Sequence, residues 1–353
     1  MLRWAEIHLN RLFHNYREIK KISGRKKIFA VVKANAYGHG SVRISKFLED
    51  KTDVSGFAVA TFEEGKELRE ARIRREILVM ASHLEEGYKE AVDYRLTPVI
   101  FDFEGLKLVK ELDIPFHVKI DTGMGRLGFL ENEWNELLSE LKYSKVEGIM
   151  SHFSSADEDL DFTKEQFKKF YSFASELKQL KPEIKIHIDN SAAIPIKFDS
   201  ILTHCRVGIA LYGSKPYPDY PLNLKQVMEV KAKVISIKEL PSEFPISYSK
   251  TYKTSKQEKV AVISFGYADG LLRSLSNKGE VLINGRRCPI RGRICMDMTI
   301  VSIEGLKVRK GDTAIISGEK LTFEEIAEKA GTIPYEIMCD ISPRVKRIYH
   351  EGV

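Results

Sequence analysis

Cysteine is scarce in this sequence, which has four cysteines among 353 residues. None belongs to a Cys-x-x-Cys pair or to a cysteine and histidine spacing typical of zinc sites, and four are too few for a disulfide framework. Long apolar runs are also missing, because no stretch of eighteen apolar residues occurs and the first twenty residues carry charges throughout. We therefore expect a cytoplasmic protein without a bound metal, a secretion signal or a membrane span.

Charge of one sign is not concentrated anywhere along the chain. The formal charge of +6 is the difference between 56 basic and 50 acidic residues, and the basic clusters at 24–27 and 72–75 are short. This distribution does not favour a nucleic-acid or membrane partner. A hydrophobic content of 43% without low-complexity tracts indicates a globular protein, long enough for one large barrel and a smaller second domain.

Short apolar runs alternate with amphipathic helical patterns as far as about residue 212. This alternation is typical of β-α units on a parallel sheet, and eight such units predict a closed, TIM-like (β/α)8 barrel. The eight runs cover residues 27–34, 55–60, 76–81, 96–101, 115–121, 146–153, 185–191 and 204–211.

The character of the sequence changes after a proline-rich stretch at 214–223, which we interpret as a linker. From Met228 onward, strand patterns are separated by short turns, with one helix expected at 322–330, so a mostly-β domain is predicted. We expect a barrel domain at 1–220 and a second domain at 221–353. Residues 1–10 also read as a strand, which we expect to pair with the second domain rather than with the barrel.

Lys33 interrupts the end of the first apolar run, where a (β/α)8 barrel carries its functional side chains. Lysine is rarely buried without a purpose, because removing the ammonium group from water costs free energy. Burial also shifts lysine towards its neutral amine, the form that makes Schiff bases. The alternative is a lysine whose ammonium group simply reaches solvent at the barrel mouth.

Polar residues also lie at four other predicted strand ends. Any one of them is consistent with a structural role, but together they converge on one barrel mouth. The hydroxyl of Ser191 and the backbone N–H groups of Gly208 and Ile209 stand where such barrels often bind phosphate. A phosphate site beside a Schiff-base lysine predicts pyridoxal 5'-phosphate (PLP). The residues at these strand ends are Asp121 with Arg126, His152, Asn190 with Ser191, and Arg206.

Nine segments resemble, in the same order, motifs of the alanine racemases, a PLP-dependent family of fold type III. The resemblance covers nearly the full chain. It implies a homodimer with shared active sites that interconverts L-alanine and D-alanine and supplies D-alanine for bacterial peptidoglycan. The segments are AVVKANAYGHG, IDTGMGRLG, SHFSSAD, IDNSAA, CRVGIALYG, SYSKTY, GYADG, GRICMDM and TIPYEI.

The resemblance also implies roles for the reacting groups. Lys33 would carry PLP as a Schiff base and act as the base on one face of the substrate, with Tyr248 of the partner subunit on the other face. Arg206 would bind the pyridine nitrogen, and His152 would connect Arg206 to Tyr248. Arg126 would contact the substrate carboxylate and the phenolic oxygen of the cofactor.

The remaining implied roles concern binding and access. Met296, beside Asp297, would bind the substrate carboxylate from the partner subunit, and Tyr267 would narrow the entrance. Lys119 matches a position where family members often carry a carbamylated lysine, which would pair with Arg126. Ordinary packing is the alternative for Tyr248, Tyr267 and Tyr335. The residues expected to bind the cofactor also include Asn190 and the phosphate ligands Tyr37, Ser191, Gly208, Ile209 and Tyr335.

Two other kinds of protein fit part of this pattern. One is another barrel-type PLP enzyme, either a decarboxylase of basic amino acids or a racemase of broader specificity. The decarboxylases favour an acidic residue at the pyridine nitrogen, where this chain offers Arg206. The other is a PLP-carrying regulatory protein with a single barrel, which would lack the β domain and Tyr248.

Overall fold

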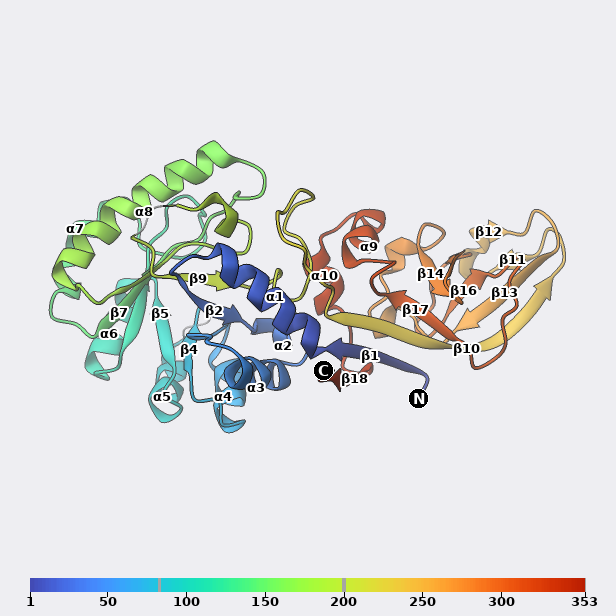
Figure 1. The fold of residues 1–353 in the computed structure, drawn as a ribbon, viewed down its shortest axis with the longest axis horizontal. Coiled ribbons are helices and arrows are strands. Elements are labelled where there is room, and N and C mark those ends of the chain that lie inside the picture. The colour runs from blue at the N-terminus through green and yellow to red at the C-terminus, as the bar shows by residue number, and fades with distance from the viewer. Residues whose placement is uncertain (82–83, 199–200, 353) are drawn as a thin grey trace.

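A computed structural model describes residues 1–81, 84–198 and 201–352. The molecule is elongated, with a barrel lobe at one end and a mostly-β lobe at the other (Figure 1). Strand β10 (Met228–Leu240) carries the chain from the barrel into the second lobe. Both predicted architectures, the TIM-like barrel and the mostly-β domain, are confirmed.

The barrel lobe contains a parallel sheet with the strand order β8-β7-β6-β5-β4-β3-β2-β9. On the side between β8 and β9, backbone hydrogen bonds from Thr203 N to Ile186 O (3.0 Å) and from Arg206 N to Asp189 O (2.9 Å) bring the barrel near to closure. Each strand lies inside a run predicted from the sequence. The bounds are β2 Lys27–Val31, β3 Gly56–Val59, β4 Glu76–Val79, β5 Thr97–Ile100, β6 Phe116–Lys119, β7 Val146–Met150, β8 Lys185–His187 and β9 His204–Val207.

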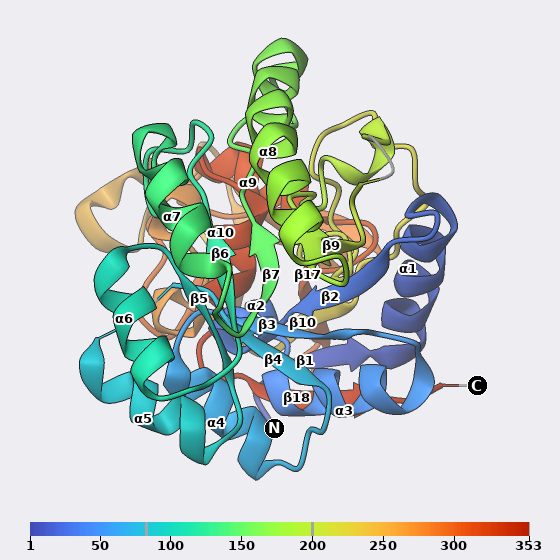
Figure 2. The same ribbon diagram turned by 90° about the vertical axis from the view of Figure 1, so that its left-hand side faces the viewer.

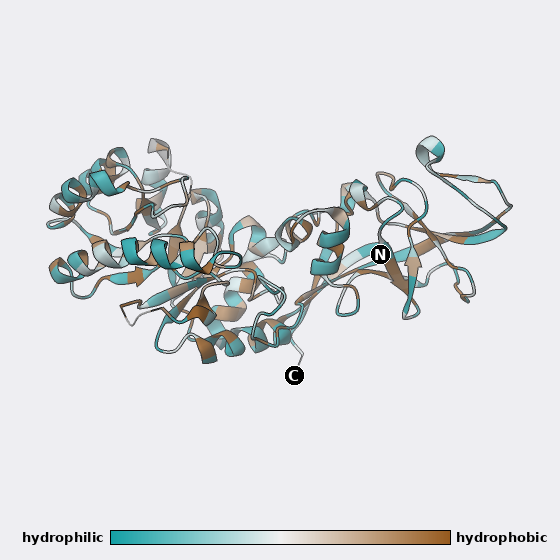
Figure 3. Cartoon of the chain, turned by 90° about the horizontal axis from the view of Figure 1, so that it is seen from above, coloured by the Kyte–Doolittle hydropathy of each residue, from teal (hydrophilic) through white to brown (hydrophobic). Residues whose placement is uncertain are grey.

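Helices surround this sheet (Figure 2) and alternate hydrophilic with hydrophobic residues along their length (Figure 3), so their apolar sides cover the barrel. Thr61, Asp102 and Asp159 cap three of them by accepting a hydrogen bond from a backbone N–H three residues further on. The bounds are α1 Leu9–Ile22, α3 Ser41–Lys51, α4 Phe62–Glu70, α5 Glu85–Asp93, α6 Phe103–Glu111, α7 Trp134–Leu141 and α8 Leu160–Leu180.

The second lobe is built on a sheet whose main path is β15-β14-β17-β10-β1-β18, with β13 pairing to β10 and β16 pairing to β13. Its remaining elements are short. Their bounds are β11 Pro245–Ile246, β12 Tyr252–Lys253, β13 Glu258–Ile263, β14 Glu280–Ile283, β15 Arg286–Pro289, β16 Thr299–Ser302, β17 Thr313–Ser317, β18 Lys346–His350, α9 Phe323–Ala330 and α10 Pro334–Cys339. Short 3-10 helices lie at Glu131–Glu133, Ile194–Ile196, Tyr248–Lys250, Tyr267–Asp269 and Arg273–Leu275.

The prediction of a single helix in the second lobe is wrong, because α10 follows α9. Helix α10 has six residues and starts with Pro334 at its first position. A helix this short shows no apolar periodicity, and proline reads as a loop signal although it is favoured at a helix start.

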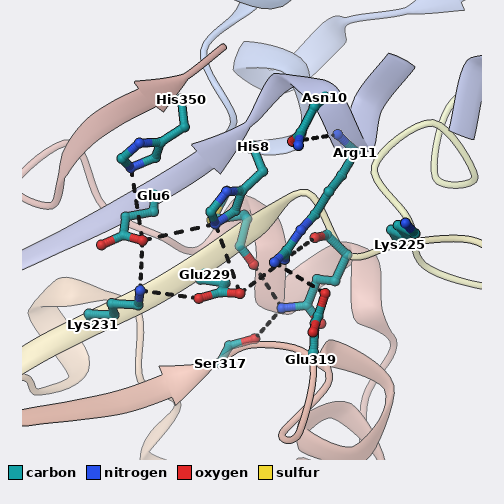
Figure 4. A network of polar contacts seen from close by, with 12 residues as sticks. Glu6, His8, Asn10, Arg11, Lys225, Glu229, Lys231, Ser317, Glu319 and His350 are labelled. Carbon is teal, nitrogen blue, oxygen red and sulfur yellow. Dashed lines mark hydrogen bonds and ion pairs between the residues drawn. The ribbon is translucent and has the colours of Figure 1, made fainter. Parts of the chain in front are cut away.

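Strand β1 (Arg3–His8) belongs to the second lobe, where it pairs antiparallel with β10 and parallel with β18. Side chains reinforce this pairing (Figure 4): Lys231 Nζ lies 2.6 Å from Glu6 and 3.2 Å from Glu229, and Arg11 lies 2.9 Å from Glu229. Glu6, His8 and Glu229 present ligand-type atoms within 4.8 Å of one another, but the two carboxylates are already paired with these cations. The network therefore fastens the start of the chain to the second sheet.

None of the described helices combines the length and the apolar character that crossing a membrane requires.

Candidate active site

A cavity of about 510 Å³ opens at the carboxyl ends of the barrel strands. The structure brings most of the predicted site residues together in its wall. A larger depression of about 870 Å³, beside Lys215, Tyr217 and Glu324, contains none of them. The predicted residues in the wall of the smaller cavity are Lys33, Tyr37, Lys119, Arg126, His152, Asn190, Ser191, Arg206, Gly208, Ile209 and Tyr335.

Lys33 lies two residues beyond the end of β2, at the first position of a short helical segment, α2 (Lys33–Tyr37). The expectation that Lys33 belongs to the strand is therefore wrong by two residues, although its place at the barrel mouth is correct. Partial burial and the nearby Arg126 guanidinium lower the pKa of Lys33. The amine therefore becomes neutral more easily than that of an exposed lysine, which suits covalent attachment of an aldehyde.

The segment after Lys33 is a left-handed turn made without glycine. Ala34, Asn35, Ala36 and Tyr37 have φ values between 50° and 54°, a conformation that costs roughly 1–2 kcal/mol per residue. Four such residues in succession mark stored backbone strain of the kind found at functional sites. The turn directs Tyr37 into the cavity.

Two neighbouring elements hold the strained turn in place. The Glu64 carboxylate accepts hydrogen bonds from Ala34 N (2.6 Å) and Ala60 N (2.7 Å). On the other side, a Cβ at Gly38 would lie 2.4 Å from the carbonyl oxygen of Met338, so α10 packs directly against the turn. The second lobe thus supports the lysine segment of the barrel.

Neutral donors gather at the end of the cavity formed by strands β8 and β9. Ser191 Oγ lies 3.1 Å from Gly208 N, and the rings of Tyr37 and Tyr335 are 5.9 Å apart. Burial raises the pKa of Tyr335 to about 12 and also raises that of Tyr37, so both hydroxyls keep their protons and can donate. The Tyr37 hydroxyl packs directly against Gly208, because a Cβ at this position would lie only 2.4 Å from it.

Asn190 lines the cavity, but its side chain has a structural task. Its Oδ1 accepts hydrogen bonds from Ala192 N and Ala193 N, both at 3.1 Å, and so shapes the turn that carries Ser191.

Arg206 is buried beside the cavity and hydrogen-bonded to its surroundings. Nη1 donates to Nδ1 (2.8 Å) and O (2.9 Å) of His187, and Nη2 donates to Ser151 O (2.6 Å), His152 Nδ1 (3.2 Å) and Ile188 O (3.2 Å). Burial lowers the pKa of Arg206 to about 10, so the guanidinium remains charged at neutral pH. Burial and the Arg206 charge hold the pKa of His152 well below its usual range, so His152 is neutral.

Arg126 and Lys119 add positive charge to the same wall. The Asp121 carboxylate accepts hydrogen bonds from Gly123 N (2.8 Å), Met124 N (2.8 Å) and Arg126 N (3.0 Å), which shapes the glycine turn that carries Arg126. Burial, with the charges of Arg126 and Arg206, lowers the pKa of Lys119 to about 8. The cavity is therefore suited to an anionic ligand.

Tyr248, Met296 and Tyr267 are not part of the cavity wall. They lie on the second lobe and are 67%, 52% and 43% exposed. The segments of Tyr267 and Met296 are linked to each other, since Tyr267 N donates to Cys295 O (3.0 Å) and Ala268 N to Met296 O (3.0 Å). Within one chain, the structure therefore separates these residues from Lys33.

The sequence reasoning overlooked two residues at the site. Glu64 supports the lysine turn, and the local signal was the Thr61-x-x-Glu64 pattern of a capping box at the start of α4; Thr61 does cap this helix, but the Glu64 carboxylate bonds Ala60 N and Ala34 N instead of closing the box. Cys339 lines the cavity from α10, but no local pattern singles it out.

The chain matches one protein family in both of its lobes. The family model for the alanine racemase N-terminal domain matches residues 7–216, and the model for the C-terminal domain matches residues 227–349. The chain belongs to the alanine racemase family. The alanine racemase of Aquifex aeolicus is 46% identical over 344 residues (97% of this chain, 98% of the relative), and that of Aquifex pyrophilus is 47% identical over 343 residues (97% of each).

The fold agrees with a solved alanine racemase from Bartonella henselae, described as having covalently bound pyridoxal phosphate. The two structures align with a TM-score of 0.92 at 29% sequence identity, covering 99% of this chain and 100% of the other. The present chain is therefore a PLP-dependent isomerase that interconverts L-alanine and D-alanine. Supplying D-alanine for the cell wall is the general role of its family. The cavity fits the cofactor, with an amine for the aldehyde and neutral donors for the phosphate.

Proposed function

We propose that this alanine racemase works with two bases, Lys33 on one face of the substrate and the partner subunit's Tyr248 on the other. When bound, PLP supplies the electron sink that makes the α C–H of alanine acidic. One base removes the α proton while the other returns a proton from the opposite face, which inverts the configuration. The observation that carries this proposal is the lowered pKa of Lys33 inside the cavity, with Tyr248 exposed outside it.

Arg206 would hold the pyridine nitrogen of the cofactor. Both of its Nη atoms are used by neighbouring groups, and its Nε–H has no partner among the described residues. A guanidinium group does not give up its proton, so the ring nitrogen stays largely unprotonated and the electron sink stays weak. A weak sink suppresses side reactions such as transamination.

His152 would connect Arg206 to the second base. Its Nδ1 accepts from Arg206, so its one proton is on Nε2 and can be donated towards the phenol of the partner subunit's Tyr248. A tyrosine normally titrates near pH 10, so a base role needs positive charge nearby to stabilise the phenolate. Arg206, acting through His152, would provide it.

Substrate binding would depend on Arg126 and on the partner subunit's Met296, both directed at the alanine carboxylate. Lys119 would be carbamylated, because its low pKa supplies the neutral amine that reacts with carbon dioxide. The carbamate is an anion and would pair with Arg126, whereas the unmodified ammonium would repel it. The cofactor phosphate would be bound by Tyr37, Ser191, Gly208, Ile209 and Tyr335.

The proposed functional unit is a homodimer in the cytoplasm, with domains at 1–220 and 221–353. The cavity of each chain is not lined by that chain's own Tyr248, Met296 and Tyr267. In the dimer, the partner subunit would place its copies of these three residues against the cavity. Tyr267 would then narrow the entrance. The four unpaired cysteines, Cys205, Cys288, Cys295 and Cys339, are consistent with a reducing compartment.

Borohydride reduction tests the covalent attachment. The purified protein should show visible absorbance that borohydride abolishes. Reduction should fix the cofactor to the peptide containing Lys33. The Lys33→Ala protein should show neither the absorbance nor the fixed cofactor. The wild type should form D-alanine from L-alanine and should release no carbon dioxide from L-lysine. A Lys33→Ala protein that still fixes the cofactor and racemises alanine at the wild-type rate would refute the proposal.

Mixed dimers test the sharing of active sites. Lys33→Ala and Tyr248→Phe are each expected to be nearly inactive as homodimers. Random mixing of the two should restore about a quarter of the wild-type activity, because half of the dimers are mixed and each mixed dimer has one intact site. Mixtures that stay inactive although mixed dimers are isolated would show that the two residues act in the same chain.

A further inference from the structure

Arg206 is a buried cation that has no carboxylate partner among the described residues. The Asp189 carboxylate, which follows β8, offsets part of this charge at longer range, while its close partner is Lys26 Nζ at 2.5 Å. Burying a cation is costly, so the hydrogen bonds that hold Arg206 decide how well its position is fixed.

His187 continues the contacts of Arg206 into the barrel interior. Arg206 Nη1 lies 2.8 Å from His187 Nδ1, and His187 Nε2 lies 2.9 Å from His117 Nδ1. A guanidinium group has donors only, so His187 Nδ1 accepts and carries no proton. The single proton of neutral His187 is therefore on Nε2 and is donated to His117.

The same reasoning fixes His117. Its Nδ1 accepts from His187, so its proton is on Nε2, which lies 3.2 Å from Oε1 of Glu76. Burial keeps both imidazoles neutral by lowering their pKa values. Burial raises the pKa of Glu76, but the ion pair with Lys185 and the contact with His117 outweigh this effect and lower that pKa, so Glu76 is ionised.

The resulting row of groups runs along the barrel. Glu76 and Lys185 are the first residues of β4 and β8, at the amino ends of the strands, and Lys185 Nζ lies 2.6 Å from Glu76. His187 is the last residue of β8, and Arg206 borders the cavity at the opposite end. The row Glu76–His117–His187–Arg206 thus joins one end of the barrel to the active site.

We infer that Glu76 is a positioning residue for the reaction, which acts through His117 and His187 to fix the orientation of Arg206. His187 donates to His117, and the Nε2 edge of His117 faces the Glu76 carboxylate at 3.2 Å, so the two imidazole dipoles point the same way and favour a cation at the Arg206 end. The inference rests on the proposed contact between Arg206 and the pyridine nitrogen. Glu76 affects the reaction only by way of Arg206.

The first test does not need the cofactor. In the apoprotein labelled with ¹⁵N-histidine, His117 and His187 should each be neutral at neutral pH, with the proton on Nε2 and none on Nδ1. Nuclear magnetic resonance distinguishes these tautomers, and single histidine variants assign the signals. A proton on Nδ1 of either ring, or a doubly protonated ring, overturns the inference whatever the enzyme catalyses.

The second test uses the holoenzyme and a matched control. Glu76→Gln removes the negative charge that faces His117, whereas Glu147→Gln removes a carboxylate that lies 3.2 Å from the same Lys185 Nζ but does not contact His117. We expect Glu76→Gln to lower kcat about tenfold, to leave KM for alanine within about twofold, and to shift the visible absorbance of the bound cofactor. Glu147→Gln should leave all three unchanged.

The outcomes separate this inference from the proposed role of Arg206. If kcat and absorbance are unchanged in Glu76→Gln, the positioning role of Glu76 is overturned. If an Arg206 variant nevertheless changes kcat and absorbance, the proposed role of Arg206 stands on its own. Should Glu76→Gln fail to fold, Glu76→Asp replaces it. The shorter side chain withdraws the carboxylate from His117, so the same loss is expected and the same absence of loss overturns the inference.

Discussion

The hydroxyl of Tyr37 lies against the backbone of Gly208, at 2.4 Å from the point where a Cβ would stand. Tyr37 is held by the left-handed turn after β2, and Gly208 follows β9, so this contact joins the loops after two paired strands of the barrel at the proposed phosphate site. The absence of a side chain at Gly208 therefore allows the Tyr37 hydroxyl to reach this site.

Gly208→Ala should therefore displace Tyr37 and weaken PLP binding, because the new methyl group cannot coexist with the hydroxyl. We expect the dissociation constant for PLP to rise at least about tenfold, the equivalent of losing one good hydrogen bond. Titration of the apoprotein with PLP measures it. The double variant Gly208→Ala/Tyr37→Phe removes the hydroxyl, so it should regain thermal stability relative to Gly208→Ala; no recovery would contradict this account of the clash.

Arg206→Glu should change the partitioning of the reaction. A carboxylic acid can protonate the pyridine nitrogen, which strengthens the electron sink and favours transamination. We expect more pyruvate to be released for each D-alanine formed, with slower racemisation. The ratio of the two products, measured by coupled assays, checks this, and an unchanged ratio in a variant that binds PLP would argue against the assigned contact.

Carbamylation of Lys119 can be observed directly. The lowered pKa of this lysine, about 8, leaves a sizeable neutral fraction near physiological pH, so protein in ¹³C-bicarbonate should show a carbamate signal in the ¹³C spectrum. The signal should be missing in Lys119→Ala. Loss of the anion should also raise KM for alanine about tenfold, because Arg126 loses a charge-assisted hydrogen bond. A wild-type spectrum without the signal ends the proposal.

Stability should fall as the pH drops below the ordinary pKa of histidine. Burial lowers the pKa values of His39, His117, His187 and His204, to about 4 for His39 and His204. In the unfolded chain these groups titrate near pH 6.5, so below that pH the unfolded state binds protons that the folded state refuses.

The free energy of unfolding should therefore decrease between about pH 6.5 and pH 4.5, by about 1.4 kcal/mol per pH unit for each of His39, His187 and His204, and His117 adds to the decrease in the same direction. Urea unfolding of the apoprotein at a series of pH values measures the slope. His204→Gln removes one of these groups, so the slope should become shallower by the contribution of one histidine, about 1.4 kcal/mol per pH unit. A flat profile across this range would show that these histidines do not resist protonation.

The barrel could be predicted because each strand follows a local rule, an apolar run of β-branched residues bounded by helical patterns. The same rule placed Lys33 at the barrel mouth, although the strand ends two residues earlier. The left-handed turn at 34–37 could not be foreseen, because it has no glycine to mark it and is held by Glu64 and Met338 from elsewhere in the fold.

The site was predictable only in part, for a related reason. Motif resemblance identified the residues of the cavity wall, such as Arg126 and Arg206, but their contacts depend on barrel closure. Glu76 and His117 are far apart in sequence and lie 3.2 Å apart in space, so no local pattern reveals the contact. The position of Tyr248 at an active site cannot be predicted from one chain, because its proposed site is formed with a partner subunit.

The position of β1 has a consequence for how the polypeptide matures. Its residues are synthesised well before the two strands on either side of it, β10 and β18. Strand β1 must therefore stay unpaired until those two segments have been made. Barrel segments can begin to collapse during synthesis, whereas the second sheet acquires its β18 edge only after that segment has left the ribosome.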